Sequence, residues 1–158
     1  MAAKLTYDDV QGLYRHHGPA LLAYATSLLG DRTAAEDTVH EVFLEMLGKV
    51  FMPDEPRPYL FRAVRNRALN SWRGRERLTT LDHHEWLVKT EATMEAAIAI
   101  EKAMRDLPVE QREVVVMKVW GEMTLDEMAK VLEIPLNTVA SRYRYALAKL
   151  REILNKKI

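Results

Sequence analysis

Residues 124 to 147, TLDEMAKVLEIPLNTVASRYRYAL, have the apolar spacing of two short α-helices separated by a sharp turn. Thr124 and Glu127 have the spacing of a capping box, in which a hydroxyl and a carboxylate each satisfy a backbone N–H group where a helix begins. Pro135 ends the turn, and Asn137 is predicted to cap the second helix. The pattern is typical of a helix-turn-helix, whose second helix often enters the major groove of DNA.

The other parts of the chain show the same helical period, so we predict an all-α protein. A polar, weakly patterned segment at residues 78–93 predicts a flexible linker between two small helical domains, residues 1–77 and 94–158. The helices expected before residue 124 span about Tyr7 to Leu29, Thr33 to Val50, Tyr59 to Arg75, Met94 to Arg105 and Leu107 to Gly121.

Specific residues indicate where the first helices begin and end. Gly30 stands where a left-handed C-terminal cap is favoured, and Thr33 with Glu36 has the spacing of a second capping box. Three prolines between residues 51 and 58 predict a loop, because proline interrupts regular structure. We therefore expect short connections between the helices of the first domain.

The composition excludes several classes of protein. The 158 residues contain no cysteine, so disulfides and thiolate metal sites are excluded. No stretch approaches the roughly 18 apolar residues of a membrane span, and no signal-peptide core follows the N-terminus. We expect a cytoplasmic protein without membrane insertion.

The formal net charge is zero, but the charges are unevenly distributed. Residues 58–77 contain six arginines and one acidic residue, and residues 124–158 contain seven basic and four acidic residues. Residues 1–57 and 78–123 each contain nine acidic and five basic residues. A polyanion such as nucleic acid would therefore bind first at the two basic segments.

The helix predicted from Tyr59 has two different sides. Phe61, Val64, Ala68 and Trp72 share an apolar side that we expect to be buried. The opposite side, called here the Tyr59 face, combines an aromatic ring, amides and guanidinium groups, the mixture that binds single-stranded nucleic acid. An ordinary solvated arginine face is the alternative, although acidic partners are nearly absent in this segment. The Tyr59 face consists of Tyr59, Arg62, Asn66, Asn70, Arg73 and Arg77.

The second helix of the helix-turn-helix also separates apolar from polar residues. Short polar residues followed by arginines are what a recognition helix presents to base edges and phosphates, whereas a generic helical hairpin is the alternative. The residues expected in the core are Val139, Tyr143, Ala146, Leu147 and Leu150. The outward side, called here the Arg142 face, consists of Asn137, Thr138, Ser141, Arg142, Arg144 and Tyr145.

The helix predicted from Thr33 has an apolar stripe and a mixed opposite side. The stripe, expected to be core, consists of Val39, Val42, Phe43, Met46, Leu47 and Val50. The opposite side, called here the Leu44 face, consists of Asp37, His40, Glu41 and Leu44. A leucine flanked by carboxylates fits either a solvated side or the centre of a protein-docking patch, and the pattern alone favours the solvated side.

Three segments carry a resemblance to one family. AAEDTVHEVFLEML (34–47) resembles a helix that docks on the clamp of core RNA polymerase, and YLFRAVRNRALNSWRGR (59–75) resembles a segment that opens and holds the −10 promoter element. Residues 106–154, from DLPVEQ to LREIL, resemble a region that reads the −35 element. Together they resemble an extracytoplasmic-function (ECF) sigma factor of the sigma-70 family, over nearly the whole chain and in the family's order.

The resemblance implies a role for each face. The Leu44 face would contact the β′ clamp, the Tyr59 face would hold the non-template strand near −10, and the Arg142 face would contact the −35 duplex. The resemblance also implies contact with the β flap of polymerase, an anti-sigma partner, and a linker at residues 78–93 that threads through polymerase. It implies no catalysis and no cofactor.

The chain departs from the family at several positions. His40 stands where Gln is common, and Asn70 replaces a frequent Asp. Asn137 and Ala140 stand where Gly and a basic residue are common, so one phosphate contact is expected to be missing. The loop at residues 51–58 lacks the usual Gly, Ser and Ala. The preference for particular bases at −10 is therefore the property of the family that is least safely extended to this chain.

Two other functions fit parts of the chain. A free-standing helix-turn-helix regulator would use residues 124–158 but leave the Tyr59 and Leu44 faces without a role. A metal site would rest on DHHE (82–85), where adjacent histidines point to different sides of a helix, so we expect a solvated pair and no metal. No G-x-S-x-G or P-loop motif occurs, and we expect no enzymatic activity.

Overall fold

The computed structural model describes residues 4–75 and 94–156, with side chains as far as residue 71 in the first range. Within these residues the regular structure is helical, apart from an isolated bridge between Lys4 and Phe51, which confirms the all-α prediction. The helices are α1 (Tyr7–Leu29), α2 (Arg32–Leu47), α3 (Pro56–Arg75), α4 (Met94–Asp106), α5 (Val109–Val119), α6 (Leu125–Leu132) and α7 (Leu136–Asn155).

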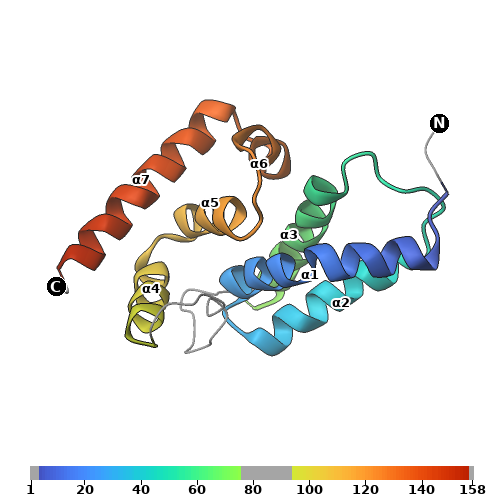
Figure 1. Cartoon of the computed structure of the whole chain (residues 1–158), viewed down its shortest axis with the longest axis horizontal. Coiled ribbons are helices and arrows are strands. Elements are labelled where there is room, and N and C mark those ends of the chain that lie inside the picture. Colours follow the sequence, from blue (N-terminus) through green and yellow to red (C-terminus); the bar gives the residue numbers. More distant parts are fainter. Residues whose placement is uncertain (1–3, 76–93, 157–158) are drawn as a thin grey trace.

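The helices pack in two groups (Figure 1). In the first group α1, α2 and α3 contact one another, and in the second α7 contacts α4, α5 and α6. The groups also contact each other, α1 with α5 and α3 with α6. Helix α5 therefore lies between α7 and α1 (Figure 1). The predicted linker, residues 78–93, lies outside the described residues.

Four of the predicted helix ends depend on local capping, and two of these predictions are confirmed. Gly30 adopts a φ of 73°, as expected of a left-handed cap, and Thr124 with Glu127 forms a capping box. The start predicted for α2 is wrong by one residue, because the side chain of Asp31 caps this helix by accepting the backbone N–H of Thr33. The helix therefore begins after Asp31, and the hydroxyl of Thr33, which was predicted to cap it, lies within its first turn.

Prolines set two helix starts that the sequence pattern misplaced. Helix α7 begins at Leu136 after Pro135, with no side-chain cap, so Asn137 lies inside the helix and is not its cap. Helix α3 begins at Pro56 and not at Tyr59. Proline fits the first turn of a helix because the backbone N–H that it lacks would have no partner there.

The apolar sides predicted for α2, α3 and α7 form much of the core, with three exceptions. The apolar side of α3 buries Phe61, Val64 and Ala68 completely, and the side chain of Trp72 lies outside the described residues. The apolar stripe of α2 buries Val39, Val42, Phe43 and Met46. Leu47, Val50 and Leu147 are exposed, against prediction. Helix α2 ends before Val50, whose carbonyl accepts the N–H of Leu5, and the two leucines border open grooves.

None of the described helices combines the length and the apolar content that crossing a membrane requires.

Candidate functional site

All four residues of the Leu44 face are exposed on α2, but the structure divides them between two hollows. His40 and Leu44 border a groove between α2 and α1, whereas Asp37 and Glu41 line a separate hollow beside Arg67 of α3. Leu44 is 66% exposed, so its substitution need not disturb the core. The groove has a volume of about 440 Å³ and is lined by Tyr7, Val10, Gln11, Tyr14, His40, Phe43, Leu44 and Leu47. The chemistry of the groove is mainly apolar and aromatic, which suits the apolar side of a partner helix.

Helix α1 contributes aromatic residues to this groove that sequence reasoning missed. The hydroxyl oxygen of Tyr14 lies 3.3 Å from Nε2 of His40, and the two rings are stacked with centroids 6.1 Å apart. Tyr7 is 68% exposed at the same groove. Tyr7 and Tyr14 are seven residues apart, a spacing that places them on one side of a helix and was visible in the sequence.

Helix α3 is tied to α2 by Arg67, which lies beside the Tyr59 face. Its guanidinium donates to Glu41 at 3.0 Å and to Glu45 at 2.6 Å. The hydrogen bond and charge of Arg67 lower the pKa of Glu45, and the bond to Glu45 in turn raises the pKa of Arg67. Glu41 thus belongs to the Leu44 face but already has a cationic partner.

The structure brings four residues of the Tyr59 face together. Tyr59, Arg62, Asn66 and Asn70 line one open hollow of about 420 Å³ on α3. Tyr59 is partly buried against the core, whereas the other three are exposed. Glu45, Ala63 and Arg67 also line it, so the hollow offers one phenol ring, two amides and two guanidinium groups, of which that of Arg67 is paired with Glu45. Arg77 and the side chain of Arg73 lie outside the described residues.

Arg62 and Arg65 of α3 also have partners, and these come from the second group of helices. Arg62 donates to the backbone carbonyl of Lys130 and lies 3.7 Å from the carboxylate of Glu133. Arg65 donates to Glu113 at 2.7 Å. The expectation of nearly unpaired arginines was therefore wrong, because it considered only acidic residues close in sequence.

The Arg142 face lies along the first turns of α7, immediately after the turn of the helix-turn-helix. Asn137, Arg144 and Tyr145 are exposed, and Thr138, Ser141 and Arg142 are partly exposed. The guanidinium group of Arg144 lies over the ring of Tyr145, 5.3 Å from its centroid. The opposite side of α7 buries Val139 and Ala146 completely, while Tyr143 and Leu150 pack at the edge of the core.

A second apolar groove lies between α4, α5 and α7, and sequence reasoning missed it. It has a volume of about 280 Å³ and is lined by Ala97, Ile100, Ala103, Met104, Val115, Val119, Trp120, Leu147, Leu150 and Leu154. Leu147 was assigned to the core from the helical period alone. The period shows which side of a helix is apolar but not whether another helix covers it.

The described residues contain no group of three or more His, Asp or Glu side chains that could hold a metal ion. The DHHE run at residues 82–85 lies outside them. His16 and His17 form an edge-to-face pair with centroids 4.6 Å apart. Burial, His16 and Arg57 lower the pKa of His17. His16 is exposed, whereas His17 is partly buried near Arg57 of α3.

Comparison with known proteins identifies the family. The model of sigma-70 region 2 matches residues 13–78, and the model of sigma-70 region 4 matches residues 97–150. The chain belongs to the sigma-70 family. It is 30% identical to an RNA polymerase sigma-E factor of Streptomyces antibioticus, over 92% of this chain and 84% of that protein. It is 28% identical to the ECF sigma factor SigL of Mycobacterium tuberculosis, over 93% and 89% of the two chains.

Solved structures of sigma factors have the same fold. The sigma factor RpoE of Bartonella quintana, solved with the anti-sigma factor NepR, has a TM-score of 0.75 and 22% identity, with 94% of this chain and 98% of that chain covered. CnrH, solved with the cytosolic domain of CnrY, has a TM-score of 0.68 and 26% identity, covering 97% and 92%. The resemblance seen in the sequence is thus confirmed: the chain is an ECF sigma factor that directs transcription initiation, and a free-standing regulator is not favoured.

Proposed function

We propose that this sigma factor binds core RNA polymerase through its two apolar grooves and reads the promoter with the faces of α3 and α7. The observation that carries the proposal is the presence of both sigma regions in one chain, each with an exposed face of suitable chemistry. Residues 1–77 would serve polymerase and the −10 element, residues 94–158 the −35 element, and residues 78–93 would connect them. The factor would act in the cytoplasm, without catalysis or cofactor.

The groove between α1 and α2 is the proposed docking site for the β′ clamp. His40 and Leu44 border it, and Asp37 and Glu41, which line a separate hollow beside Arg67, would extend the contact along α2. Exposed leucines at the centre of a polar rim are typical of protein interfaces. The groove between α4, α5 and α7 would receive the β flap, because an apolar helix side fits such a groove.

The faces of α3 and α7 are the proposed contacts to DNA. The hollow that Tyr59, Arg62, Asn66 and Asn70 line would hold unpaired bases of the −10 element, with Arg73 and Arg77 near the phosphates. Asn137, Thr138, Ser141, Arg142, Arg144 and Tyr145 would contact base edges and phosphates of the −35 duplex. RpoE was solved with the anti-sigma factor NepR, so an anti-sigma protein is the proposed regulator of this chain.

In vitro transcription with bacterial core polymerase over a library of promoter sequences tests the proposal. We expect transcripts only when the chain is added, from promoters that share a −35 and a −10 element. Leu44→Asp should weaken co-elution with core polymerase by at least tenfold without lowering the melting temperature, because Leu44 is exposed. Val50→Asp is the matched control, since Val50 is 57% exposed and lies outside the groove. Equal effects of both variants would refute the docking site.

A further inference from the structure

Helix α7 is longer than the reading of base edges requires. Its 20 residues span about 30 Å. The major groove of DNA is only about 12 Å wide, and in a helix-turn-helix the first residues of the recognition helix contact the bases. Lys149 follows Asn137 by 12 residues, or about 18 Å along the helix axis. When Asn137 lies at the base edges, the second half of α7 therefore reaches the border of the groove, where the phosphates are.

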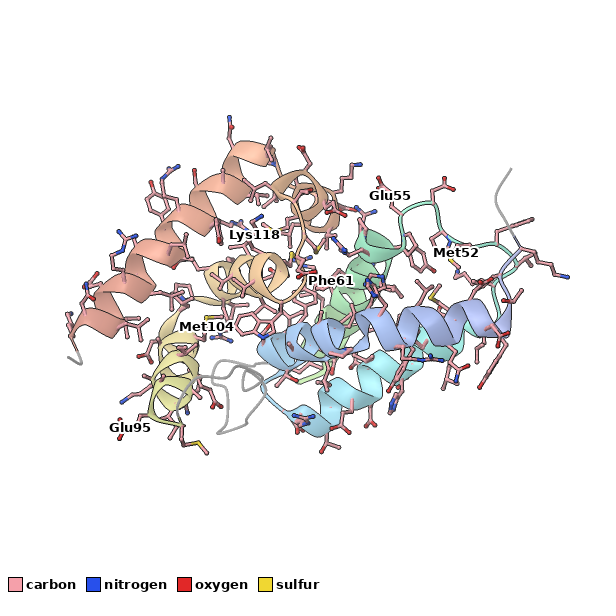
Figure 2. The ribbon with its side chains drawn as sticks, viewed as in Figure 1. Met52, Glu55, Phe61, Glu95, Met104 and Lys118 are labelled. Atoms are coloured by element: carbon pink, nitrogen blue, oxygen red, sulfur yellow. The ribbon has the colours of Figure 1, made fainter. Side chains whose placement is uncertain are left out.

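Positive charge in the second group of helices is concentrated on α7. Helix α7 contains four basic residues and one acidic residue, whereas α4, α5 and α6 together contain five basic and seven acidic residues. Figure 2 shows side chains with nitrogen atoms at their tips along the outer side of α7. A polyanion would therefore be attracted to α7 more strongly than to its neighbours.

The four basic residues form two lines along the outward side of α7, called here the basic edges. Residues seven apart lie nearly in line, because they are about two helical turns apart. Arg142 and Lys149 form one edge, and Arg144 and Arg151 form the other. Successive residues are about 100° apart around a helix, so the two edges are about 160° apart across the outward side. The residues between the edges include the uncharged Asn137, Ser141, Tyr145 and Ala148.

This arrangement matches the cross-section of a major groove. The two sugar-phosphate backbones border the groove, and the base edges form its floor. A ridge of uncharged residues between two basic edges places small or polar groups at the bases and positive charge beside both backbones. The same relation continues from the first half of α7, at Arg142 and Arg144, into the second half, at Lys149 and Arg151.

The cations of the second half are available to a partner. Lys149 and Arg151 are both exposed, and among the described residues neither side chain takes part in an ion pair or a hydrogen bond. Lys156 differs, because its Nζ lies 3.4 Å from the carboxylate of Glu152. The basic edges therefore end with two cations whose charge no neighbouring carboxylate offsets within the described part of the chain.

We propose that Lys149 and Arg151 bind DNA phosphates on the two strands that border the −35 element, beyond those within reach of the Arg142 face. This inference rests on the proposed function, because it assumes that the first turns of α7 lie in the groove. Phosphate contacts fix the position of a protein on the duplex but carry no sequence information. The second half of α7 thus supplies affinity and register, and the first half supplies specificity.

The salt dependence of promoter binding tests this division. The probe is a labelled promoter duplex, bound by holoenzyme that is assembled from core polymerase and the full chain. The double variant Lys149→Gln with Arg151→Gln should bind about tenfold more weakly. The slope of log affinity against log salt should become shallower by about 1.8, since each phosphate contact contributes about 0.9. The preference for this promoter over one with a scrambled −35 element should change less than twofold.

A second double variant provides the matched control. Lys102→Gln with Lys118→Gln also removes two exposed cations, but from α4 and α5; Lys118 is labelled in Figure 2. Circular dichroism shows whether each chain is folded. Equal affinities and slopes of the two double variants would refute the phosphate contacts, and so would a loss of affinity with an unchanged slope. Promoter binding equal to that of the control, with weaker binding to a polyglutamate peptide, would assign the edges to an acidic protein and also refute the proposal.

Neutral methylphosphonate linkages locate the contacts. Each linkage replaces one phosphate within or beside the −35 element and removes its charge. At least one linkage on each strand should weaken binding by the unchanged chain but not by the Lys149→Gln, Arg151→Gln variant. If every linkage affected both chains alike, the inference would be wrong while the proposed function stood. Failure of the unchanged holoenzyme to bind or transcribe any promoter would refute the proposed function itself, and this inference with it.

Discussion

Replacing Arg112 by Met should destabilise the folded chain, because Arg112 satisfies several buried backbone carbonyls at once. The side chain is 4% exposed on α5. Its Nε donates to the carbonyl of Met104 at 3.0 Å, and its two terminal nitrogens donate to Ser27 at 2.9 Å and to Leu107 at 3.1 Å. One terminal nitrogen also donates to the carbonyl of Arg105 at 3.4 Å. A methionine of similar length fills the space but donates no hydrogen bond. The carbonyl of Met104 keeps the N–H of Leu107 as a donor, whereas the carbonyls of Ser27, Arg105 and Leu107 lose the donor that Arg112 supplied.

The expected loss follows from these three carbonyls. A buried acceptor without a donor costs about 1–3 kcal/mol, and the lower figure for three acceptors gives about 3 kcal/mol. Burial lowers the pKa of Arg112, which shows that desolvation of its charge opposes folding, and methionine avoids that cost. We therefore expect the free energy of unfolding to fall by about 2–4 kcal/mol and the melting temperature by about 4–16 °C.

Urea unfolding followed by circular dichroism measures this loss. Arg151→Met is the matched control, since Arg151 is exposed on α7 and its substitution should change the free energy of unfolding by less than about 0.5 kcal/mol. A loss below about 1 kcal/mol for Arg112→Met would refute the reasoning, because the three carbonyls would then have found other partners. The free energy of unfolding of Arg112→Lys should fall between those of the unchanged chain and Arg112→Met, because one ammonium group cannot reach all three carbonyls.

Three further predictions concern α7, the buried phenol and the turn before α6. Arg142→Ala should weaken binding to −35 duplex DNA about tenfold in a mobility-shift assay while co-elution with core polymerase survives; equal loss of both would mean that the face is wrong. Burial and Glu113 raise the pKa of Tyr24 well above its ordinary value, so the unfolded chain loses this proton first and stability should fall as the pH rises above about 10. Tyr24→Phe should show a shallower alkaline decline in the free energy of unfolding, and an identical slope would contradict the assignment. Glu122 has a φ of 52°, so Glu122→Gly should raise the free energy of unfolding by about 0.5–1 kcal/mol in urea unfolding, and a decrease would contradict the strain.

Local patterns predicted the helices well because the interactions that form them are local. The bounds of α1 and its cap at Gly30 were predicted correctly, as was the capping box of Thr124. The errors at Thr33 and Asn137 arose where a neighbouring residue was the better start of the helix, Asp31 in one case and Pro135 in the other. Such competition is decided within one turn of helix.

Exposure of apolar residues depended on long-range packing. Leu47 and Leu147 belong to the apolar sides of α2 and α7, but each borders a groove that the described helices leave open. The helical period is the same whether a neighbouring helix covers an apolar side or not. The two grooves could therefore be recognised only once the positions of α1, α4 and α5 were known.

The order of helices, the all-α class and the three candidate faces follow from periodicity, capping and charge along the chain, which act between residues within a few turns of each other. The pairing of the arginines does not. Arg65 is 48 residues from Glu113, and Arg62 is 68 residues from the Lys130 carbonyl that it reaches. Because a charged side chain takes its partner from whichever segment the fold brings near, only the tertiary structure revealed that arginines of α3 contact the second group of helices.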